Sequence, residues 1–299
     1  MNTVLEINNL TKTYGRITAV KNLSLSIPKG SVFGILGPNG SGKTTTLGII
    51  LDVINRTSGS YLWFGDESNN EVRKRIGAIL ETPIFYPYLS AVKNLEVVAE
   101  IKEVPFDNIE QVLKKVELFD RRNDKYRTFS LGMKQRLSIA SALLCDPEVM
   151  ILDEPTNGLD PQGIAEIREL IKQIALEGKT IILASHLLDE VQKVCSDFCV
   201  LKKGSLIYVG KVEEVSAGVI QVEVRSDSPE LEKSLESFEG VSAVEKDLHG
   251  FIATLAEGYD AAGLNRHLHE NGISLSYLVT QRKSLEKQFL ELLAQSDDA

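Results

Sequence analysis

The chain has 299 residues, more than a single core usually organises, so we expect one large domain and one small one. Hydrophobic residues make up 43% and charged residues 25% of the sequence, as in an ordinary soluble globular protein, and the net charge of −9 argues against a surface that binds nucleic acid. No apolar run approaches the roughly 20 residues that span a bilayer, and the N-terminus lacks the features of a signal peptide, so we expect a cytoplasmic location.

The first 30 residues predict antiparallel strands. Apolar and polar residues alternate at Leu5–Ile7 and again at Leu23–Ile27, before the turn residues Pro28 and Gly30. This two-residue alternation is typical of strands with one face on the core and the other in water. We therefore expect an antiparallel β subdomain at the start of the chain.

A phosphate-binding loop follows. The apolar run Val32–Leu36 predicts a buried strand, and helical spacing of apolar residues begins at Leu47. The segment between them fits G-x-x-x-x-G-K-[ST] and consists of Gly37, Pro38, Asn39, Gly40, Ser41, Gly42, Lys43 and Thr44, to which we add Thr45. Unpaired N–H groups and the positive dipole end of the helix suit phosphate oxygens, and glycines let the backbone wrap around them. We expect a nucleoside triphosphate here, with Lys43 on its β- and γ-phosphates and the Thr44 hydroxyl on Mg²⁺.

The pattern of the sequence changes between about residues 85 and 145. Apolar residues recur at helical spacing in three segments, Ser90–Lys102, Asn108–Phe119 and Leu131–Leu144. Ser90 and Ser130 are expected to cap two of these helices at their N-termini. These residues predict a helical insertion in an α/β core.

Two further apolar runs predict parallel strands of that core. Val149–Leu152 ends at the adjacent carboxylates Asp153 and Glu154, and Ile181–Ala184 is followed by His186. A carboxylate at the tip of a buried strand can hold Mg²⁺ or its water, so we expect Asp153 to bind the metal. Glu154 is then placed to accept a proton from water that attacks the γ-phosphate. The alternative is a strand end held by salt bridges.

A separate unit is expected after about residue 213, so we divide the chain into residues 1–213 and 214–299. Its elements follow the order β-α-β-β-α-β, which predicts a small α+β domain of the ferredoxin-like type. The segments are 219–224, 230–238, 241–246, 250–255, 261–270 and 273–279, with a last helix at 284–293. The three cysteines, too few for a disulfide framework, are expected to be free thiols.

The start of the third helix in the insertion carries a specific resemblance. Residues 129–133 read Phe-Ser-Leu-Gly-Met, at the place where an ABC-type ATPase, the nucleotide-binding subunit of an ABC transporter, has its signature motif L-S-G-G-Q. Ser130 and Gly132 match that motif, whereas its first glycine and its glutamine are replaced. The resemblance implies a P-loop NTPase fold and ATP hydrolysis, with Ser130 and Gly132 contacting the ATP that a second subunit holds. The alternative is a helix that is merely capped.

Other landmarks of that family occur in the same order. Asp160 resembles the aspartate that faces the second subunit, and His186 resembles the histidine that contacts the γ-phosphate. Tyr14 resembles the aromatic residue that stacks on adenine. The residues alone leave open a structural role for His186 and strand packing for Tyr14.

One position departs from the family. Glu81 follows the run Ile76–Leu80, where the family usually has Gln. A carboxylate can still bind Mg²⁺ or orient water, so we count Glu81 with the metal-binding and catalytic residues and expect altered metal dependence with ATP binding retained. With this glutamate, the Ser-Leu-Gly-Met-Lys signature and the C-terminal extension, the chain resembles ABC-2 exporters of the bacitracin and lantibiotic type.

The resemblance also implies partners. Two subunits would enclose two ATP molecules head to tail, and hydrolysis would drive export through a permease on a separate chain, which would hold the subunit at the inner face of the cell membrane. The docking surface is expected near residues 82–105. Two alternatives stay open: a soluble ABC ATPase with no transport role, and a regulatory nucleotide-binding module with reduced hydrolysis.

Overall fold

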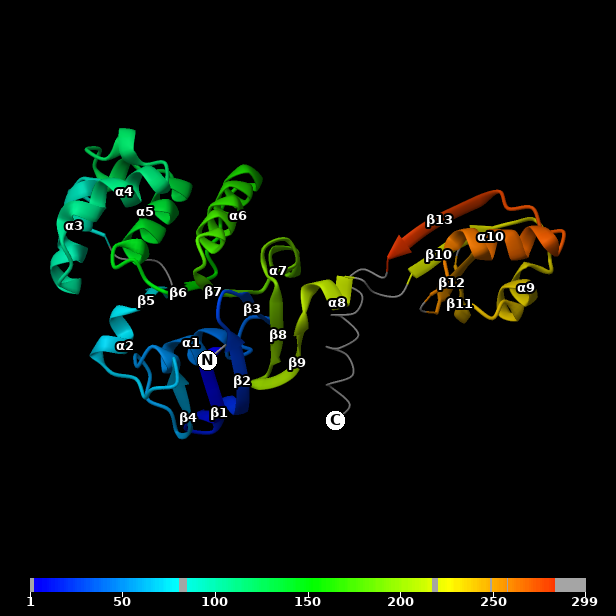
Figure 1. The fold of residues 1–299 in the computed structure, drawn as a ribbon, viewed down its shortest axis with the longest axis horizontal. Coiled ribbons are helices and arrows are strands. Elements are labelled where there is room, and N and C mark those ends of the chain that lie inside the picture. Colours follow the sequence, from blue (N-terminus) through cyan, green and yellow to red (C-terminus); the bar gives the residue numbers. More distant parts are fainter. Residues whose placement is uncertain (1–2, 81–84, 217–219, 248, 257, 283–299) are drawn as a thin grey trace. The chain divides into compact units, whose positions relative to one another are not determined.

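The structure is a computed structural model that describes residues 3–80, 85–216, 220–247, 249–256 and 258–282. The chain divides into two compact units, Met1–Val212 and Glu213–Ala299 (Figure 1). Within the described residues, the first unit contains two sheets and a lobe of helices, and the second contains one sheet with helices.

The centre of the first unit is a six-stranded sheet in the order β5-β6-β7-β3-β8-β9. Its strands are β3 (Val32–Leu36), β5 (Ile76–Ile79), β6 (Val149–Asp153), β7 (Thr180–Ser185), β8 (Asp197–Lys202) and β9 (Ser205–Lys211). Neighbours pair in parallel from β5 to β8, and β9 pairs antiparallel with β8. Every residue of β3, β6 and β7 is buried, which confirms the prediction of central parallel strands covered on both faces.

A three-stranded antiparallel sheet packs beside this core. Its order is β2-β1-β4, formed by β1 (Thr3–Tyr14), β2 (Ile17–Pro28) and β4 (Ser58–Trp63). One hydrophobic cluster contains residues of both sheets and of helix α1 (Lys43–Ile50), among them Leu5, Phe33 and Trp63. The indole Nε1 of Trp63 donates a 2.8 Å hydrogen bond to the carbonyl oxygen of Ile50, so the strand and the helix are joined within the core. The predicted antiparallel subdomain is confirmed.

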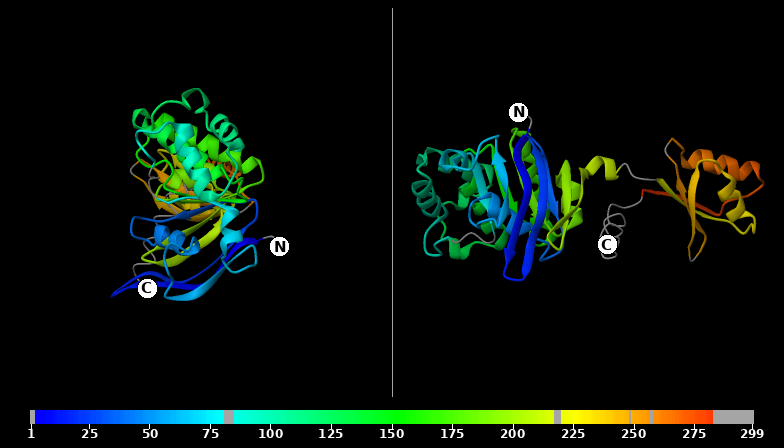
Figure 2. Two further views of the ribbon diagram at one scale, coloured as in Figure 1. Left: turned by 90° about the vertical axis from the view of Figure 1, so that its left-hand side faces the viewer. Right: turned by 90° about the horizontal axis from the view of Figure 1, so that it is seen from below.

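Three helices form the insertion. They are α3 (Ala91–Lys102), α4 (Ile109–Lys115) and α5 (Leu131–Leu143), separated by the short 3₁₀ turns η1 (Phe106–Asn108), η2 (Phe119–Arg121) and η3 (Tyr126–Thr128). Figure 1 shows these helices as one lobe, and Figure 2, from below, shows that lobe to one side of the long strands β1 and β2. Ser90 and Ser130 cap α3 and α5 as predicted. The middle helix ends at Lys115, earlier than the predicted Phe119, because Glu117 adopts a left-handed backbone with φ of 57°.

Of the remaining helices, α2 (Asn70–Lys74) connects β4 to β5, and α6 (Pro161–Leu176) and α7 (Leu188–Val194) connect strands of the large sheet. Helix α8 (Val212–Ser216) begins at the last residue of the first unit and continues into the second. Asp160 caps α6, and Pro161 occupies its first turn. Proline lacks a backbone N–H, but an N–H in the first turn would have no acceptor within the helix, so no hydrogen bond is lost. None of the helices in the described parts of either unit has the length and apolar character that a membrane crossing needs.

The second unit has the element order β10 (Ile220–Arg225), α9 (Leu231–Ser237), β11 (Val241–Lys246), β12 (Phe251–Leu255), α10 (Ala261–Glu270) and β13 (Tyr277–Arg282). All its strand pairs are antiparallel, in the order β11-β12-β10-β13, which is a ferredoxin-like arrangement. The last strand begins at Tyr277, later than the predicted 273, because Ile273 packs into the core of the unit instead of pairing. The helix predicted at 284–293 lies outside the described residues.

Candidate active site

Three parallel strand ends position the candidate site. Strand β6 ends at Asp153 and is followed by Glu154, β7 is followed by His186, and β3 is followed by the phosphate loop. Carboxyl ends of parallel strands lie at one edge of a sheet, where ligands bind in open α/β folds. The backbone N–H of Gly37 donates to the carbonyl oxygen of Ser185 at 3.3 Å, which joins the start of the phosphate loop to the end of β7.

The phosphate loop leads into α1 through a conformation that only glycine adopts readily. Gly42, which precedes the helix, has φ of 103°, and a Cβ atom there would lie 2.5 Å from the carbonyl oxygen of Ala19. Neither a side-chain cap nor an acidic residue occupies the described first turn of α1. Its N–H groups and positive dipole end are therefore open to an anion. Pro38, Asn39 and Gly40 are exposed, Ser41 is buried, and Thr45 lies partly exposed in the first turn.

Lys43 is buried beneath the loop. Its side chain is only 6% exposed, and its Nζ donates to the carbonyl oxygen of Gly37 at 2.8 Å and to that of Pro38 at 3.4 Å. The same Nζ lies 3.4 Å from Oε1 of Glu154. The positive charge thus stands between the phosphate loop and the end of β6.

Thr44 and Asp153 form a pair of oxygen ligands. The Thr44 hydroxyl donates a 2.8 Å hydrogen bond to Oδ2 of Asp153, and Asp153 is 5% exposed. Hydroxyl and carboxylate oxygens held side by side are the donors that Mg²⁺ prefers. The residues therefore fit a magnesium site beside the phosphate loop.

Glu154 and His186 complete this group. Nδ1 of His186 lies 2.8 Å from Oε2 of Glu154, and the backbone N–H of His186 donates to the same oxygen at 3.4 Å. Glu154 has φ of 48°, a left-handed backbone that costs about 1–3 kcal/mol for a residue with a side chain. The N–H of Glu154 donates to the carbonyl oxygen of Ala184, and its carbonyl oxygen accepts from the N–H of Asn157. These two hydrogen bonds hold Glu154 in that conformation. The carboxylate is 22% exposed, which leaves it accessible to water.

The signature segment lies in a second group of residues. Ser130 caps α5 by accepting a hydrogen bond from the N–H of Met133 at 3.3 Å. Ser130, Gly132 and Asp160 line a cavity of about 370 Å³ between the starts of α5 and α6. Asp160 is the N-cap of α6, since Oδ1 accepts from the N–H of Gly163 at 2.9 Å. A Cβ atom on Gly132 would meet no described atom within 4 Å, so the packing of this chain does not itself require glycine at that position.

Two predicted site residues, Tyr14 and Glu81, remain. Tyr14 ends β1 with 47% of its surface exposed, so the ring is not packed in the core, and Nζ of Lys12 lies 4.6 Å from its centroid. Glu81 lies outside the described residues, so its predicted roles stay predictions.

The structure also contains site residues that the sequence patterns did not identify. Ser185 and Glu190 are buried and hydrogen-bonded to each other directly beside His186. A serine at the end of an otherwise apolar strand was the available signal for the first. Glu190 carried no such signal, because a carboxylate in a short helix usually faces solvent.

The comparisons with known proteins agree with this arrangement. A family model described as "ABC transporter" matches residues 20–157. The ABC transporter ATP-binding protein YhcH of Bacillus subtilis, itself described as uncharacterized, is 46% identical over 72% of this chain and 72% of its own length. The bacitracin transport ATP-binding protein BcrA of Bacillus licheniformis is 36% identical over 98% of both chains.

A solved structure matches the first unit. The ATP-binding cassette MJ0796, in a dimeric post-hydrolysis state bound to ADP and Pi, is 30% identical, with a TM-score of 0.62 over 70% of this chain and 98% of the cassette. The P-loop NTPase fold, with its antiparallel subdomain and helical insertion, is therefore confirmed. This chain belongs to the ABC transporter family and is an ATP-binding, ATP-hydrolysing subunit of such a transporter.

Proposed function

We propose that the residues at the ends of β3, β6 and β7 hydrolyse ATP in defined roles. Lys43 and the N–H groups of the phosphate loop bind the β- and γ-phosphates, and Thr44 and Asp153 hold Mg²⁺, which would neutralise charge on the phosphates. Glu154 accepts the proton of the attacking water, and His186 keeps its carboxylate in place and contacts the γ-phosphate. The observation that carries this proposal is the Glu154 carboxylate, bonded to His186 at 2.8 Å and 3.4 Å from Lys43.

We propose that a second ATPase subunit completes the site. The N-terminus of α5 presents Ser130 and the uncrowded Gly132 beside a cavity, where a phosphate from another subunit could approach closely. The dimeric state of the related cassette MJ0796 supports this arrangement. Two bound ATP molecules would then hold two subunits together until hydrolysis weakens the contact.

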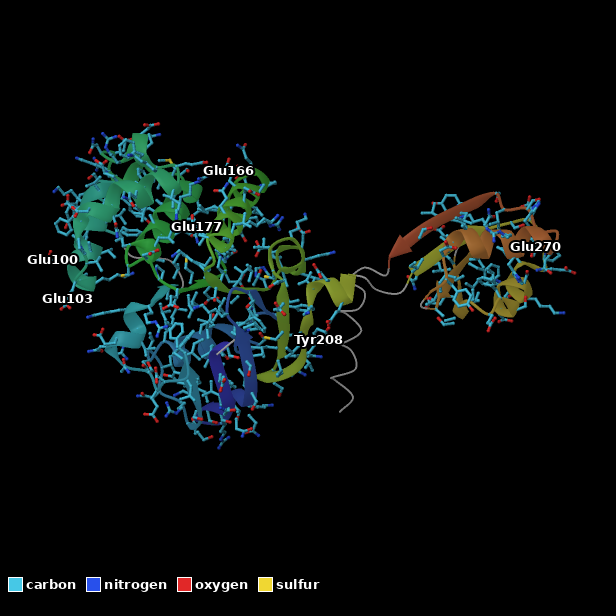
Figure 3. All side chains as sticks on the ribbon, viewed as in Figure 1. Glu100, Glu103, Glu166, Glu177, Tyr208 and Glu270 are labelled. Carbon is cyan, nitrogen blue, oxygen red and sulfur yellow. The ribbon has the colours of Figure 1, made fainter. Side chains whose placement is uncertain are left out.

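A permease on a separate chain is the proposed membrane partner. Tyr86 and Tyr88 are 48% and 64% exposed, and their rings lie 5.8 Å apart beside the start of α3. Buried Asn94 fixes this segment, accepting from the N–H of Tyr86 at 2.8 Å and donating to its carbonyl oxygen at 3.2 Å. Exposed aromatic side chains on a fixed segment are typical of interaction surfaces. Glu100, near the end of α3, and Glu103, just after the helix, lie on the outside of the lobe (Figure 3).

The proposed transport direction is export, with peptide antibiotics of the bacitracin class as the substrate. The support is the full-length similarity to BcrA, a bacitracin transport protein. The permease would recognise the substrate and hold this subunit at the inner face of the cell membrane.

Co-purification tests the partnership. The tagged chain is co-expressed with a candidate permease, chosen as any multi-helix membrane protein that a neighbouring gene encodes, and the solubilised membranes are captured on the tag. We expect the membrane protein to be retained, and Tyr86→Ala with Tyr88→Ala to reduce its recovery. Val53→Ala, which shortens another exposed apolar side chain, is the control. Equal recovery for all three chains would contradict the proposed docking surface, and no recovery at all would favour a soluble ABC ATPase.

A further inference from the structure

A buried carboxyl group lies behind the candidate active site. Glu190 of α7 is 1% exposed, and Ser185 at the end of β7 is 0% exposed. The Ser185 hydroxyl donates a 2.6 Å hydrogen bond to Oε2 of Glu190 and accepts one from the N–H of Leu187 at 3.0 Å. The chain from Ser185 to Leu187 is thus closed into a turn by one hydroxyl group, and His186 is the residue at the middle of that turn.

The helix that carries Glu190 is fixed to the phosphate-loop strand. A Cβ atom on Gly34 of β3 would lie 3.0 Å from Cγ1 of Val191 and 3.1 Å from Sγ of Cys195, so α7 packs against the backbone of β3. The N–H of Glu190 also donates to the carbonyl oxygen of Leu187 at 3.2 Å. Because α7 is closely packed and cannot easily move, it holds the Glu190 carboxyl group in place against Ser185.

Burying this carboxyl group is costly for the fold. Its Oε1 has no hydrogen-bond partner among the described residues, and an unsatisfied buried polar atom destabilises a protein. Arg168 of α6, Glu154 after β6 and His186 after β7 face it, together with Cys195 at the end of its own helix. An apolar residue would pack here at less cost, so the carboxyl group points to a role beyond folding.

We propose that Glu190 is a positioning residue for ATP hydrolysis, which acts through Ser185 to fix the turn that presents His186 to Glu154. The inference rests on the proposed roles of Glu154 and His186. If Glu190 is removed, the Ser185 hydroxyl is free to rotate, the Leu187 N–H loses its fixed acceptor, and His186 no longer meets Glu154 at 2.8 Å in most molecules. Substrate binding by the phosphate loop would be unaffected.

Steady-state ATPase measurements on the purified chain test this inference. We expect Glu190→Ala to lower kcat about tenfold while the KM for ATP changes less than about twofold. Glu190→Gln keeps an oxygen that accepts from Ser185, so it should restore kcat to near the parent value. Asp189→Asn is the matched control, since it removes a neighbouring carboxylate on the exposed face of α7.

A double mutant makes the test specific. If Glu190 acts through Ser185, the double variant Ser185→Ala/Glu190→Ala should be no slower than Ser185→Ala alone. Additive losses would overturn the inference, as would an unchanged kcat for Glu190→Ala or an equal loss for Glu190→Gln. Should Glu190→Ala fail to fold, Ser185→Ala must still lower kcat at unchanged KM, and its failure to do so would count equally against the inference. His186→Ala and Glu154→Gln, measured in parallel, distinguish a failure of this inference from a failure of the proposed function. Full activity in these two variants would refute the proposed function itself.

Discussion

Nζ of Lys43 lies 3.4 Å from Oε1 of Glu154, so the phosphate-loop lysine and the proposed base share one electrostatic site. Both side chains are mostly buried, at 6% and 22% exposure, and opposite charges attract more strongly there than at the surface. Bound phosphate would take over the lysine as partner, which leaves the carboxylate to His186 and the attacking water. This exchange would link nucleotide binding to the release of the proposed base from Lys43.

Replacing Lys43 should abolish that exchange. We expect Lys43→Ala to weaken ATP binding by at least about a hundredfold, because a buried charge-assisted contact to phosphate is lost. Isothermal titration calorimetry measures the loss directly. Lys74→Ala, which removes an exposed lysine paired with Glu71, serves as control. An unchanged affinity in Lys43→Ala would contradict the assignment of the phosphate loop.

Replacing Glu154 should separate binding from hydrolysis. Glu154→Gln keeps the shape of the side chain and an acceptor for His186 but removes the proton acceptor, so kcat should fall by about 10²–10⁴. ATP should then hold two subunits together, which size-exclusion chromatography with Mg-ATP would detect as a dimer. Glu169→Gln, on the exposed face of α6, should behave as the parent chain. A Glu154→Gln chain that stays monomeric at saturating ATP would count against the composite site.

The Thr44–Asp153 pair predicts a metal dependence. Asp153→Asn keeps the hydrogen bond from Thr44 but loses the carboxylate charge, so we expect the Mg²⁺ concentration for half-maximal ATPase activity to rise about tenfold or more. Titrating Mg²⁺ at fixed ATP measures the shift. An identical Mg²⁺ profile in parent and variant would rule out Asp153 as a ligand.

Glu190 predicts a pH dependence of stability. Burial raises the pKa of this carboxyl group, while Ser185 and Arg168 act in the opposite direction. A raised pKa in the folded state favours folding below the unfolded pKa of about 4.3, and that contribution is lost as the pH rises through the folded pKa. The side chain that Glu190→Gln introduces does not titrate. The free energy of unfolding of this variant should therefore increase relative to that of the parent chain as the pH rises.

The fluorescence of Trp63, the one tryptophan of the sequence and a buried residue of the first unit, makes this measurable. Urea unfolding of both chains between pH 5 and pH 8 gives the difference in free energy, and each unit of pKa shift is worth about 1.4 kcal/mol. A difference that does not vary with pH would show that Glu190 keeps an ordinary pKa.

Most of the fold could be predicted because its signals are local. The phosphate loop fits a continuous pattern, and β3, β6 and β7 are apolar runs that end at polar residues. The contact between Lys43 and Glu154 could not be predicted in this way, since it depends on how distant strand ends meet. Burial of Glu190 was missed for the same reason: it is set by α7 packing on Gly34, which the sequence of the helix does not reveal. Helix α4 was predicted too long because apolar spacing continues past the left-handed residue Glu117.

The carbonyl oxygen of Ala19 has a wider consequence. It would lie 2.5 Å from a Cβ on Gly42 and 2.8 Å from one on Gly204, and the N–H of Gly204 donates to the carbonyl oxygen of Ser41 at 3.0 Å. A methyl group on Gly204, in the hairpin between β8 and β9, would therefore push the hairpin away from β2 and disturb its hydrogen bond to Ser41 of the phosphate loop. An alanine scan would score this glycine as a nucleotide contact, although its effect would be purely mechanical.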